Sequence, residues 1–277
     1  MHNAYASNIW DLQGKTIVVP GGGGMLGKVV CLALVREGAN VVILARSPSK
    51  LSSFMESLGD LPGRGVVLEA DVLEREKLFN ARNRIQEKFG EVYGLLNFAG
   101  GNVPEATTSV DRRFFDLPED ALRYAIELNL LGTVFPCQVF GSLMAQASLG
   151  VIINVASMAG YRPLTRTVAY SAAKAAVANF TQWLAVHMAK EYSAGIRVNA
   201  VAPGFFHTTQ NHYLLYDEAT GDLTPRGKSI IAHTPMGRFG EPEDLVGAVL
   251  WLLSPLSKFV TGAVIPVDGG FSAFSGV

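Results

Sequence analysis

This 277-residue chain has few cysteines, almost no net charge and no long apolar run. The two cysteines, Cys31 and Cys137, are too few for a disulfide scaffold and lack the spacing of a zinc site. The formal net charge is −1, so no basic excess indicates a nucleic acid or an anionic membrane as partner. Apolar runs of about 18 residues, which would predict a membrane span, are missing, and residues 1–15 lack the apolar core of a signal peptide. We therefore expect a cytoplasmic chain that binds neither nucleic acid nor membrane.

Apolar residues make up 49% of the chain and charged residues 17%, which favours a large core over disorder. Short apolar stretches predict strands at 16–20, 40–45, 65–71, 92–100, 150–156, 196–203 and within 260–270. Helical spacing predicts helices at 25–38, 47–59, 73–89, 119–147 and 167–192, and another after Pro242. This alternation indicates an α/β fold: a single doubly wound parallel sheet of the Rossmann type with helices on both faces. We expect one domain over 1–277.

Residues 205–235 interrupt the alternation because they are aromatic, polar and less regular. Their position predicts an insertion at the carboxyl edge of the sheet. Long irregular segments at such an edge often cover active sites, so we expect a substrate lid here. Ordinary surface helices are the alternative interpretation.

A glycine-rich loop follows the first predicted strand. It comprises Gly21, Gly22, Gly23, Gly24, Met25, Leu26 and Gly27. Gly22, Gly24 and Gly27 match the G-x-G-x-x-G pattern, and the loop has the strand before it and the helix after it that the pattern requires. Such a loop lets the backbone approach a pyrophosphate at a helix N-terminus, so it predicts a dinucleotide site. A tight turn without a ligand is the alternative.

The end of the second predicted strand bears on the choice of dinucleotide. An NAD site usually has an acidic residue here, but this chain has Ala45, Arg46 and Ser47. A guanidinium binds phosphate well, so Arg46 and Ser47 favour NADP, with NAD still possible. Arg46 can instead be a solvated surface residue. Asp71, after the third strand, can bind the adenine amino group, cap the next helix, or do both.

Four polar residues predict hydride-transfer chemistry with a proton donor. Tyr170 and Lys174 share one face of a helix, Ser157 follows a strand, and Asn129 lies in an apolar helix where its amide needs a partner. Lys174 is expected to lower the phenol pKa of Tyr170 towards neutrality and to bind the nicotinamide ribose. Ser157 would hold the substrate oxygen. Asn129 could fix a water that links Lys174 to solvent. The alternatives are an exposed helix face for Tyr170 and Lys174, a turn for Ser157 and a helix bend for Asn129.

With these residues in place, the chain resembles the short-chain dehydrogenase/reductase family over nearly its whole length. Matching positions are Gly21, Gly23, Gly27, Asp71, Asn97–Gly100, Asn129, Ser157, Tyr170, Lys174, Pro203, Gly204, Thr208 and Pro266–Gly270. The resemblance implies Asn129, Ser157, Tyr170 and Lys174 as catalytic residues, Asn97 as a brace of the sheet, and Pro203, Gly204 and Thr208 at the nicotinamide. Val72, Ala99 and Gly100 complete the expected cofactor site. The family usually has Thr at the position of Pro20 and Gly at that of Met25, so these two residues are departures.

Longer stretches resemble the branch called D-mannonate oxidoreductase or fructuronate reductase, including GGGGMLG, APGFFHTTQN and VTGAVIPVDGG. This implies interconversion of a sugar-acid hydroxyl and a ketone, and the family implies a homotetramer. Arg162 and Arg166 can clamp a carboxylate, while Asn102, His207, Gln210 and Asn211 can bind hydroxyls; each can also be a solvated loop residue. His207 and His212 have no accompanying carboxylate cluster, so we predict no metal. The alternatives are gluconate or another polyol or ketone as substrate, or a non-catalytic NADP-binding sensor.

Overall fold

The computed structural model describes residues 9–208, 212–217 and 220–276. These residues form one seven-stranded sheet in the order β3-β2-β1-β4-β5-β6-β7, and every neighbouring pair is parallel. The strands are β1 (Thr16–Pro20), β2 (Asn40–Ala45), β3 (Arg64–Glu69), β4 (Gly94–Asn97), β5 (Gly150–Val155), β6 (Ile196–Pro203) and β7 (Val264–Val267). The order reverses between β1 and β4, where doubly wound sheets bind their ligands. The predicted Rossmann-type α/β fold is confirmed.

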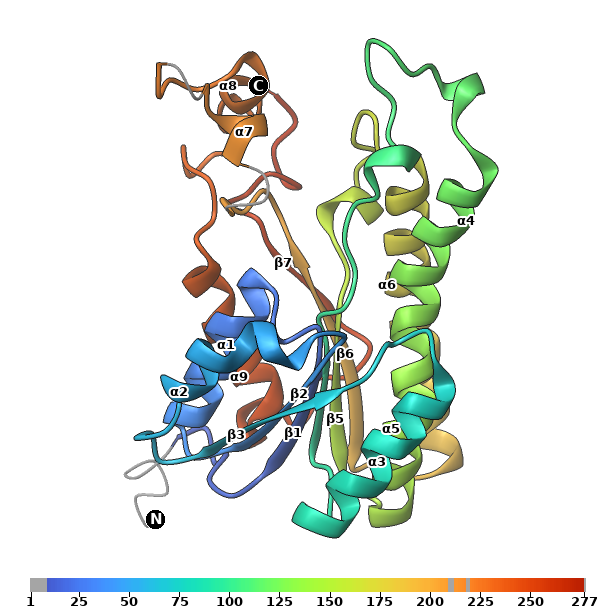
Figure 1. Ribbon diagram of the computed structural model, residues 1–277, viewed down its shortest axis with the longest axis vertical. Coiled ribbons are helices and arrows are strands. Elements are labelled where there is room, and N and C mark those ends of the chain that lie inside the picture. The colour runs from blue at the N-terminus through green and yellow to red at the C-terminus, as the bar shows by residue number, and fades with distance from the viewer. Residues whose placement is uncertain (1–8, 209–211, 218–219, 277) are drawn as a thin grey trace.

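Alternate residues of each strand enter two different cores. In β1, Ile17 and Val19 pack with helices α1 (Met25–Arg36) and α9 (Val246–Leu253) on one face. Val18, between them, packs with the helices of the other face. Both faces of the central strands are therefore buried, which explains why these strands are continuously apolar in the sequence. Figure 1 shows the two helical layers on either side of the sheet.

The second layer contains α3 (Arg75–Phe89), α5 (Gly132–Ala147) and α6 (Val168–Glu191). α4 (Glu119–Ile126) runs into α5 through a π-helical turn, Glu127–Leu131, so the helix predicted over 119–147 is continuous but irregular. The segment predicted as a helix over 47–59 is a 3-10 turn, Pro48–Leu51, followed by the short α2 (Ser52–Glu56). The helix expected after Pro242 begins as a 3-10 turn, Pro242–Leu245, and continues as α9.

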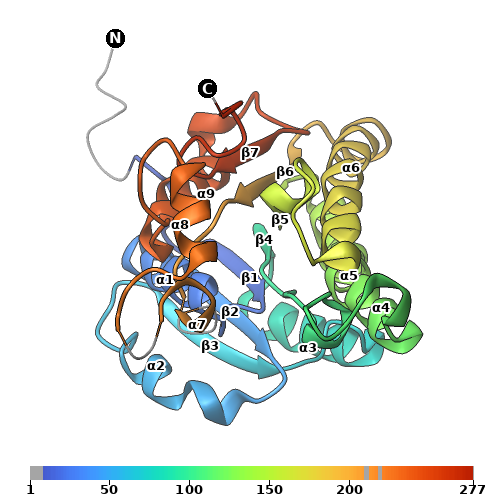
Figure 2. The ribbon, with the colours of Figure 1, turned by 90° about the horizontal axis from the view of Figure 1, so that it is seen from above.

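The strand predicted at 92–100 is shorter in the structure, and those predicted at 65–71 and 150–156 end two residues and one residue earlier. β4 ends at Asn97 because the chain then turns towards the glycine-rich loop, where the Phe98 N–H donates to the Pro20 carbonyl at 2.9 Å. β7 covers only part of 260–270. The segment 205–235 contains α7 (His212–Leu215) and α8 (Pro225–Ala232), which lie beyond the carboxyl ends of the strands (Figures 1 and 2).

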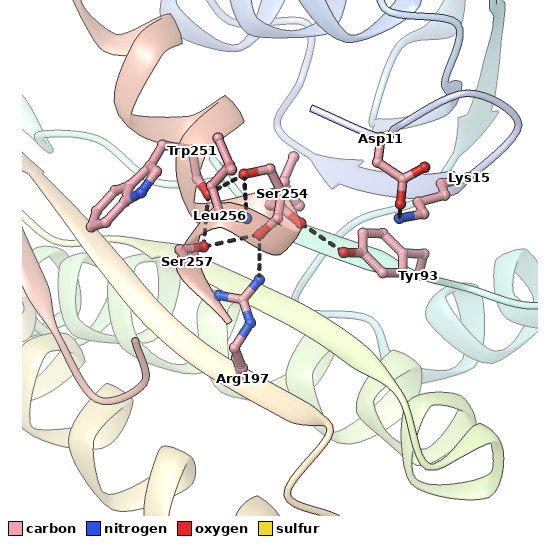
Figure 3. A network of polar contacts seen from close by, with 9 residues as sticks. Asp11, Lys15, Tyr93, Arg197, Trp251, Ser254, Leu256 and Ser257 are labelled. Carbon is pink, nitrogen blue, oxygen red and sulfur yellow. Dashed lines mark hydrogen bonds and ion pairs between the residues drawn. The ribbon is translucent and has the colours of Figure 1, made fainter. Parts of the chain in front are cut away.

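A polar network ties α9 to the opposite, amino-terminal end of the sheet (Figure 3). The Tyr93 hydroxyl donates to the Leu253 carbonyl at 2.7 Å, and the guanidinium of Arg197 on β6 donates to the Ser254 carbonyl at 3.2 Å. Ser257 donates to the Trp251 carbonyl at 2.7 Å. Burial lowers the pKa of Arg197. This end of the sheet is thus held by fixed hydrogen bonds, while the loops of the other end carry the predicted site.

One helix among the described residues, Glu119–Ala147, is long and apolar enough to cross a membrane by length and composition. Just over half of its most apolar window, 56%, is buried inside the protein. Core helices pass the same test, and this one packs on the sheet through α5.

Candidate active site

The glycine-rich loop packs so closely against the chain after β4 that side chains are excluded. Gly21 has φ +76°, and a Cβ there would lie 2.4 Å from the Ala99 backbone nitrogen. A Cβ on Gly27 would lie 2.8 Å from the Gly21 carbonyl oxygen. The turns after β1 and β4 therefore form one compact surface of exposed backbone, which is the kind of surface that admits a pyrophosphate.

Helix α1 begins at Met25, directly after its N-cap Gly24. Because Met25 is already helical, its side chain causes no backbone strain at the position where the family usually has glycine. The first turn of α1, including Leu26, offers backbone N–H groups and the positive end of the helix dipole. Pro20 is the last residue of β1, and its carbonyl still accepts the Phe98 N–H. Neither departure from the family disturbs the loop, and the cradle fits a dinucleotide.

At Gly22 and Gly23 the nearest atoms belong to side chains. A Cβ on Gly22 would lie 3.0 Å from Cys31 Sγ, and one on Gly23 would lie 2.9 Å from Leu51 Cδ2. Burial raises the pKa of the Cys31 thiol well above its usual range, so this cysteine packs as an apolar residue.

The expected adenosine end of the site lies at the ends of β2 and β3. Arg46 and Ser47 are exposed immediately after β2. An Asp71 carboxylate oxygen accepts the Leu73 N–H at 2.9 Å, so this residue stabilises the turn before α3, although the α3 N-cap is Glu74. Val72 is buried against Gly132, where a Cβ would lie 3.0 Å from its Cγ2. Asp71 thus stabilises the turn that precedes α3 and does not cap α3 as predicted, and its contact with adenine stays a prediction.

Asn97 links two central strands inside the protein. Its amide donates to Asn154 Oδ1 of β5 at 2.8 Å and to Cys137 Sγ at 3.2 Å. Asn154 in turn donates to Thr181 of α6 at 2.9 Å. Sequence reasoning missed Asn154 and Thr181; the signal was an amide inside the otherwise apolar strand 150–156. The network fixes the start of the Ala99–Gly100 turn.

Asn129 lies at the centre of the π-helical turn and is fully buried. Its Oδ1 accepts the Gly101 N–H at 2.9 Å, and its amide donates to the carbonyls of Gly101 and Ala125, both at 2.9 Å. π-helical turns often mark functional sites. Here the turn directs the amide at Gly101, and Asn129 Oδ1 and Lys174 Nζ both lie against Gly100.

Ser157, Tyr170 and Lys174 come together at the carboxyl end of β5. Ser157 and Tyr170 form a side-chain hydrogen bond, and Ser157 Oγ also accepts the Ala159 N–H at 3.1 Å. Lys174 is 3% exposed. Its ammonium donates to the Val155 carbonyl at 2.7 Å and lies 5.7 Å from the centre of the Tyr170 ring.

The pKa values of this group differ from the expectation. Burial raises the pKa of Tyr170, and the hydrogen bond with Ser157 opposes that shift without cancelling it. Burial lowers the pKa of Lys174 to about 8. The predicted fall in the Tyr170 pKa is therefore wrong for this structure, because desolvation of the phenolate outweighs its stabilisation. The phenol is a proton donor at neutral pH, and the ammonium is close to its own titration.

The segment after β6 faces the same end of the sheet. Pro203 closes the strand, and a Cβ on Gly204 would lie 2.8 Å from Asp268 Cα. Thr208 is partly buried and interacts with another residue. His207 Nε2 and His212 Nδ1 are hydrogen-bonded at 3.0 Å. No cluster of three or more histidine, cysteine or acidic side chains suited to a metal occurs within the described ranges.

The other expected substrate residues are spread over two regions. Asn102 is engaged with Thr107 of its own loop, Nδ2 to Oγ1 at 3.0 Å. The guanidinium of Arg162 donates to the Ser272 carbonyl at 2.9 Å, which holds it at the C-terminal segment. Arg166 instead lines a pocket with Arg226 of α8, a residue that sequence reasoning missed. Gln210 and Asn211 lie outside the described residues.

The sequence model of a family described as enoyl-(acyl carrier protein) reductase matches residues 24–272. An uncharacterized oxidoreductase of Bacillus subtilis (strain 168), UxuB, is 45% identical over 276 residues, covering 96% of this chain and 98% of the relative. Cyclohexanol dehydrogenase of Rhodococcus sp. (strain TK6) is 32% identical, covering 94% of this chain and 97% of the relative.

A solved structure of a candidate D-mannonate oxidoreductase from Haemophilus influenzae, with bound NAD, is 42% identical and superimposes with a TM-score of 0.90. The match covers 96% of this chain and 98% of that one. Relatives of this identity and coverage share the fold, and they agree in being oxidoreductases. The chain therefore belongs to the short-chain dehydrogenase/reductase family and is an NAD(P)-dependent oxidoreductase.

Proposed function

We propose that the protein interconverts a hydroxyl and a ketone on a sugar acid of the D-mannonate/D-fructuronate type. The observation that carries the proposal is the convergence of Ser157, Tyr170 and Lys174 beside the glycine-rich cradle. The 42% identity to a candidate D-mannonate oxidoreductase supports the substrate class.

In the proposed mechanism, a bound nicotinamide supplies the hydride acceptor or donor. During reduction, Ser157 orients the ketone oxygen and Tyr170 protonates it as the carbon receives hydride. During oxidation, the Tyr170 phenolate takes the hydroxyl proton as the carbon loses hydride. The Lys174 ammonium stabilises the phenolate in both directions, while Asn129 positions the Gly100–Gly101 backbone through its hydrogen bonds.

The dinucleotide would lie across the carboxyl ends of the strands. Its pyrophosphate would contact the Gly21–Gly27 loop, and its nicotinamide side would lie near Pro203, Gly204 and Thr208. We propose that Arg46 and Ser47 favour NADP because both are exposed after β2. NAD in the Haemophilus influenzae relative supports NAD as the alternative cofactor.

We propose that the segment 205–235 serves as the lid of a single domain, with α8 over the site. Gluconate or another polyol or ketone is the alternative substrate. The 32% identity to a cyclohexanol dehydrogenase supports a neutral alcohol as one such substrate. A non-catalytic NADP-binding sensor is the remaining alternative; the intact set Asn129, Ser157, Tyr170 and Lys174 argues against it.

Self-association as a homotetramer is part of the proposal. A groove of about 730 Å³ between α5 and α6 is lined by Phe180, Trp183, His187 and Tyr192, and Trp183 is 57% exposed. An apolar hollow of this kind suits a second copy of the chain. Trp183→Glu should reduce the assembly measured by sedimentation, and an unchanged mass would reject this interface.

We propose the cytoplasm as the compartment, because the thiols of Cys31 and Cys137 are both free and buried.

The experiment that tests the function follows absorbance of reduced nicotinamide with D-mannonate, run in parallel with NADP and NAD. Rapid reduction of NADP over NAD supports both the substrate class and the role of Arg46. Reduction of NAD alone keeps the reaction and rejects that role. Turnover with gluconate or a neutral polyol but not with D-mannonate favours the alternative substrate. Dinucleotide binding without turnover across a panel of sugar acids and polyols favours the sensor.

A further inference from the structure

A pocket of about 480 Å³ lies between the loop that leads to the Tyr170 helix and helix α8 of the segment 205–235. The polar residues Arg166, Arg226, Ser229 and His233 line it, together with the aromatic rings of Phe205 and Phe271. The two rings pack edge to face, with centroids 5.2 Å apart. No carboxylate lines this pocket, within the part of the chain that the structure describes.

The two arginines face each other without a counter-charge. Arg226 is partly buried, and its pKa is lowered first by burial and then by the positive charge of Arg166. Neither guanidinium forms an ion pair with a described acidic residue. Arg166 is exposed, so only Arg226 loses hydration here. The two like charges still repel each other, and an anion between them would relieve the repulsion.

The backbone holds both arginines in place. Arg166 has φ +78°, a conformation that non-glycine residues rarely adopt, and its carbonyl accepts the Thr108 N–H at 3.0 Å. Arg226 is in the first turn of α8, where Thr224 Oγ1 accepts the Gly227 N–H at 3.0 Å. His233, at the other end of α8, is fixed by a 2.7 Å hydrogen bond from Nδ1 to the Ser229 carbonyl. Strain maintained at a pocket wall is typical of ligand-binding positions.

We infer that Arg166 and Arg226 together bind the carboxylate of the substrate, so that α8 distinguishes sugar acids from neutral polyols. This inference rests on the proposed function and assigns its specificity to one pair of side chains. Arg162 is excluded from the pair because its guanidinium is held by Ser272. Two residues that line the pocket are close in sequence to the expected site: Arg166 lies four residues before Tyr170, and Phe205 follows Pro203 and Gly204.

The test compares wild-type protein with Arg226→Gln, using D-mannonate and its neutral lactone as ligands in the presence of saturating dinucleotide. Binding is measured by calorimetry and turnover by nicotinamide absorbance. We expect Arg226→Gln to weaken D-mannonate binding and raise its KM at least about ten-fold, with little effect on kcat, on lactone binding or on the KM of the dinucleotide. Arg226→Lys should restore part of the affinity. Lys228→Gln, which removes an exposed charge from the same helix outside the pocket, is the matched control.

The outcomes separate the inference from the function. Unchanged D-mannonate affinity in Arg226→Gln, or wild-type protein that prefers the lactone, overturns the inference even if D-mannonate is oxidised. A rise in the KM of the dinucleotide alone assigns Arg226 to a cofactor phosphate and also overturns it. Tight, Arg226-dependent binding of D-mannonate without turnover supports the carboxylate site and rejects the proposed reaction.

Discussion

The ammonium of Lys174 lies 5.7 Å from the centre of the Tyr170 ring while it donates to the Val155 carbonyl at 2.7 Å. The same buried ammonium thus contacts the end of β5 and the ring of Tyr170. Free lysine and tyrosine side chains have similar pKa values, but burial lowers the Lys174 pKa to about 8 and raises that of Tyr170, so the two values move apart. As the pH rises, Lys174 is therefore the first of the two to lose its proton, while the phenol stays protonated.

Replacement of Tyr170 by Phe removes the proton donor and leaves the ring in place. We expect Tyr170→Phe to bind dinucleotide with wild-type affinity and to lose about a thousand-fold in kcat. Fluorescence titration of the dinucleotide and steady-state kinetics measure the two quantities. Tyr161→Phe, which removes a nearby hydroxyl bonded to the Val264 carbonyl, is the control. Near-normal turnover of Tyr170→Phe would reject the mechanism.

The depressed pKa of Lys174 predicts a pH dependence of stability. Below pH 8 the buried Lys174 ammonium is charged, and its lost hydration destabilises the folded protein. Between pH 8 and 10.5 the folded protein releases this proton while the unfolded chain still holds it, so the destabilisation disappears. The free energy of unfolding should therefore rise above pH 8, by at most about 1.4 kcal/mol per pH unit from this group. Urea unfolding at pH 7.5 and 9 measures the rise. Lys174→Met should lack this rise in stability and lose turnover. Lys190 is exposed on the same helix, so Lys190→Met should keep both the rise and the turnover.

Because Gly21 packs against Ala99, a side chain at position 21 should destabilise the protein by more than its backbone strain alone. Gly21→Ala places a methyl group 2.4 Å from the Ala99 nitrogen at φ +76°. We expect a loss of about 2 kcal/mol or more in the free energy of unfolding, together with weaker dinucleotide binding. Gly90 has the same φ, and its Cβ would meet no atom within 4 Å, so Gly90→Ala isolates the strain alone. Equal losses in the two variants would contradict the close packing.

Arg46 decides the proposed preference for NADP. Arg46→Gln should lower the ratio of kcat/KM for NADP to that for NAD by about ten-fold or more, because a bidentate partner of the 2′-phosphate is lost. Steady-state kinetics with both dinucleotides measure the ratio. Lys50→Gln, an exposed charge on the adjoining 3-10 turn, should leave it unchanged. An unaltered ratio in Arg46→Gln makes this arginine a solvated surface residue.

The fold was predictable because its central strands are buried on both faces. Strands 40–45 and 196–203 are mostly apolar, and their bounds agree with β2 and β6. The π-helical turn at Asn129 was not predictable, since the pattern of apolar residues over 119–147 is compatible with a regular helix. Arg226 was missed for another reason: its sequence neighbours are those of a solvated helix, and only the folded chain brings it opposite Arg166.

The π-helical turn also changes which side of the long helix the residues after it face. Its wider ring holds one residue more than an α-helical turn, which rotates the following residues by about 100° about the helix axis. Ala121 and Ala125 of α4 consequently face the loop near Val103 and the start of α6, whereas Phe140 and Met144 of α5 face the sheet. Asn129 lies at the centre of the turn, between these two halves, and holds Gly101 by hydrogen bonds. One helix therefore both packs on the core and holds the active-site loop.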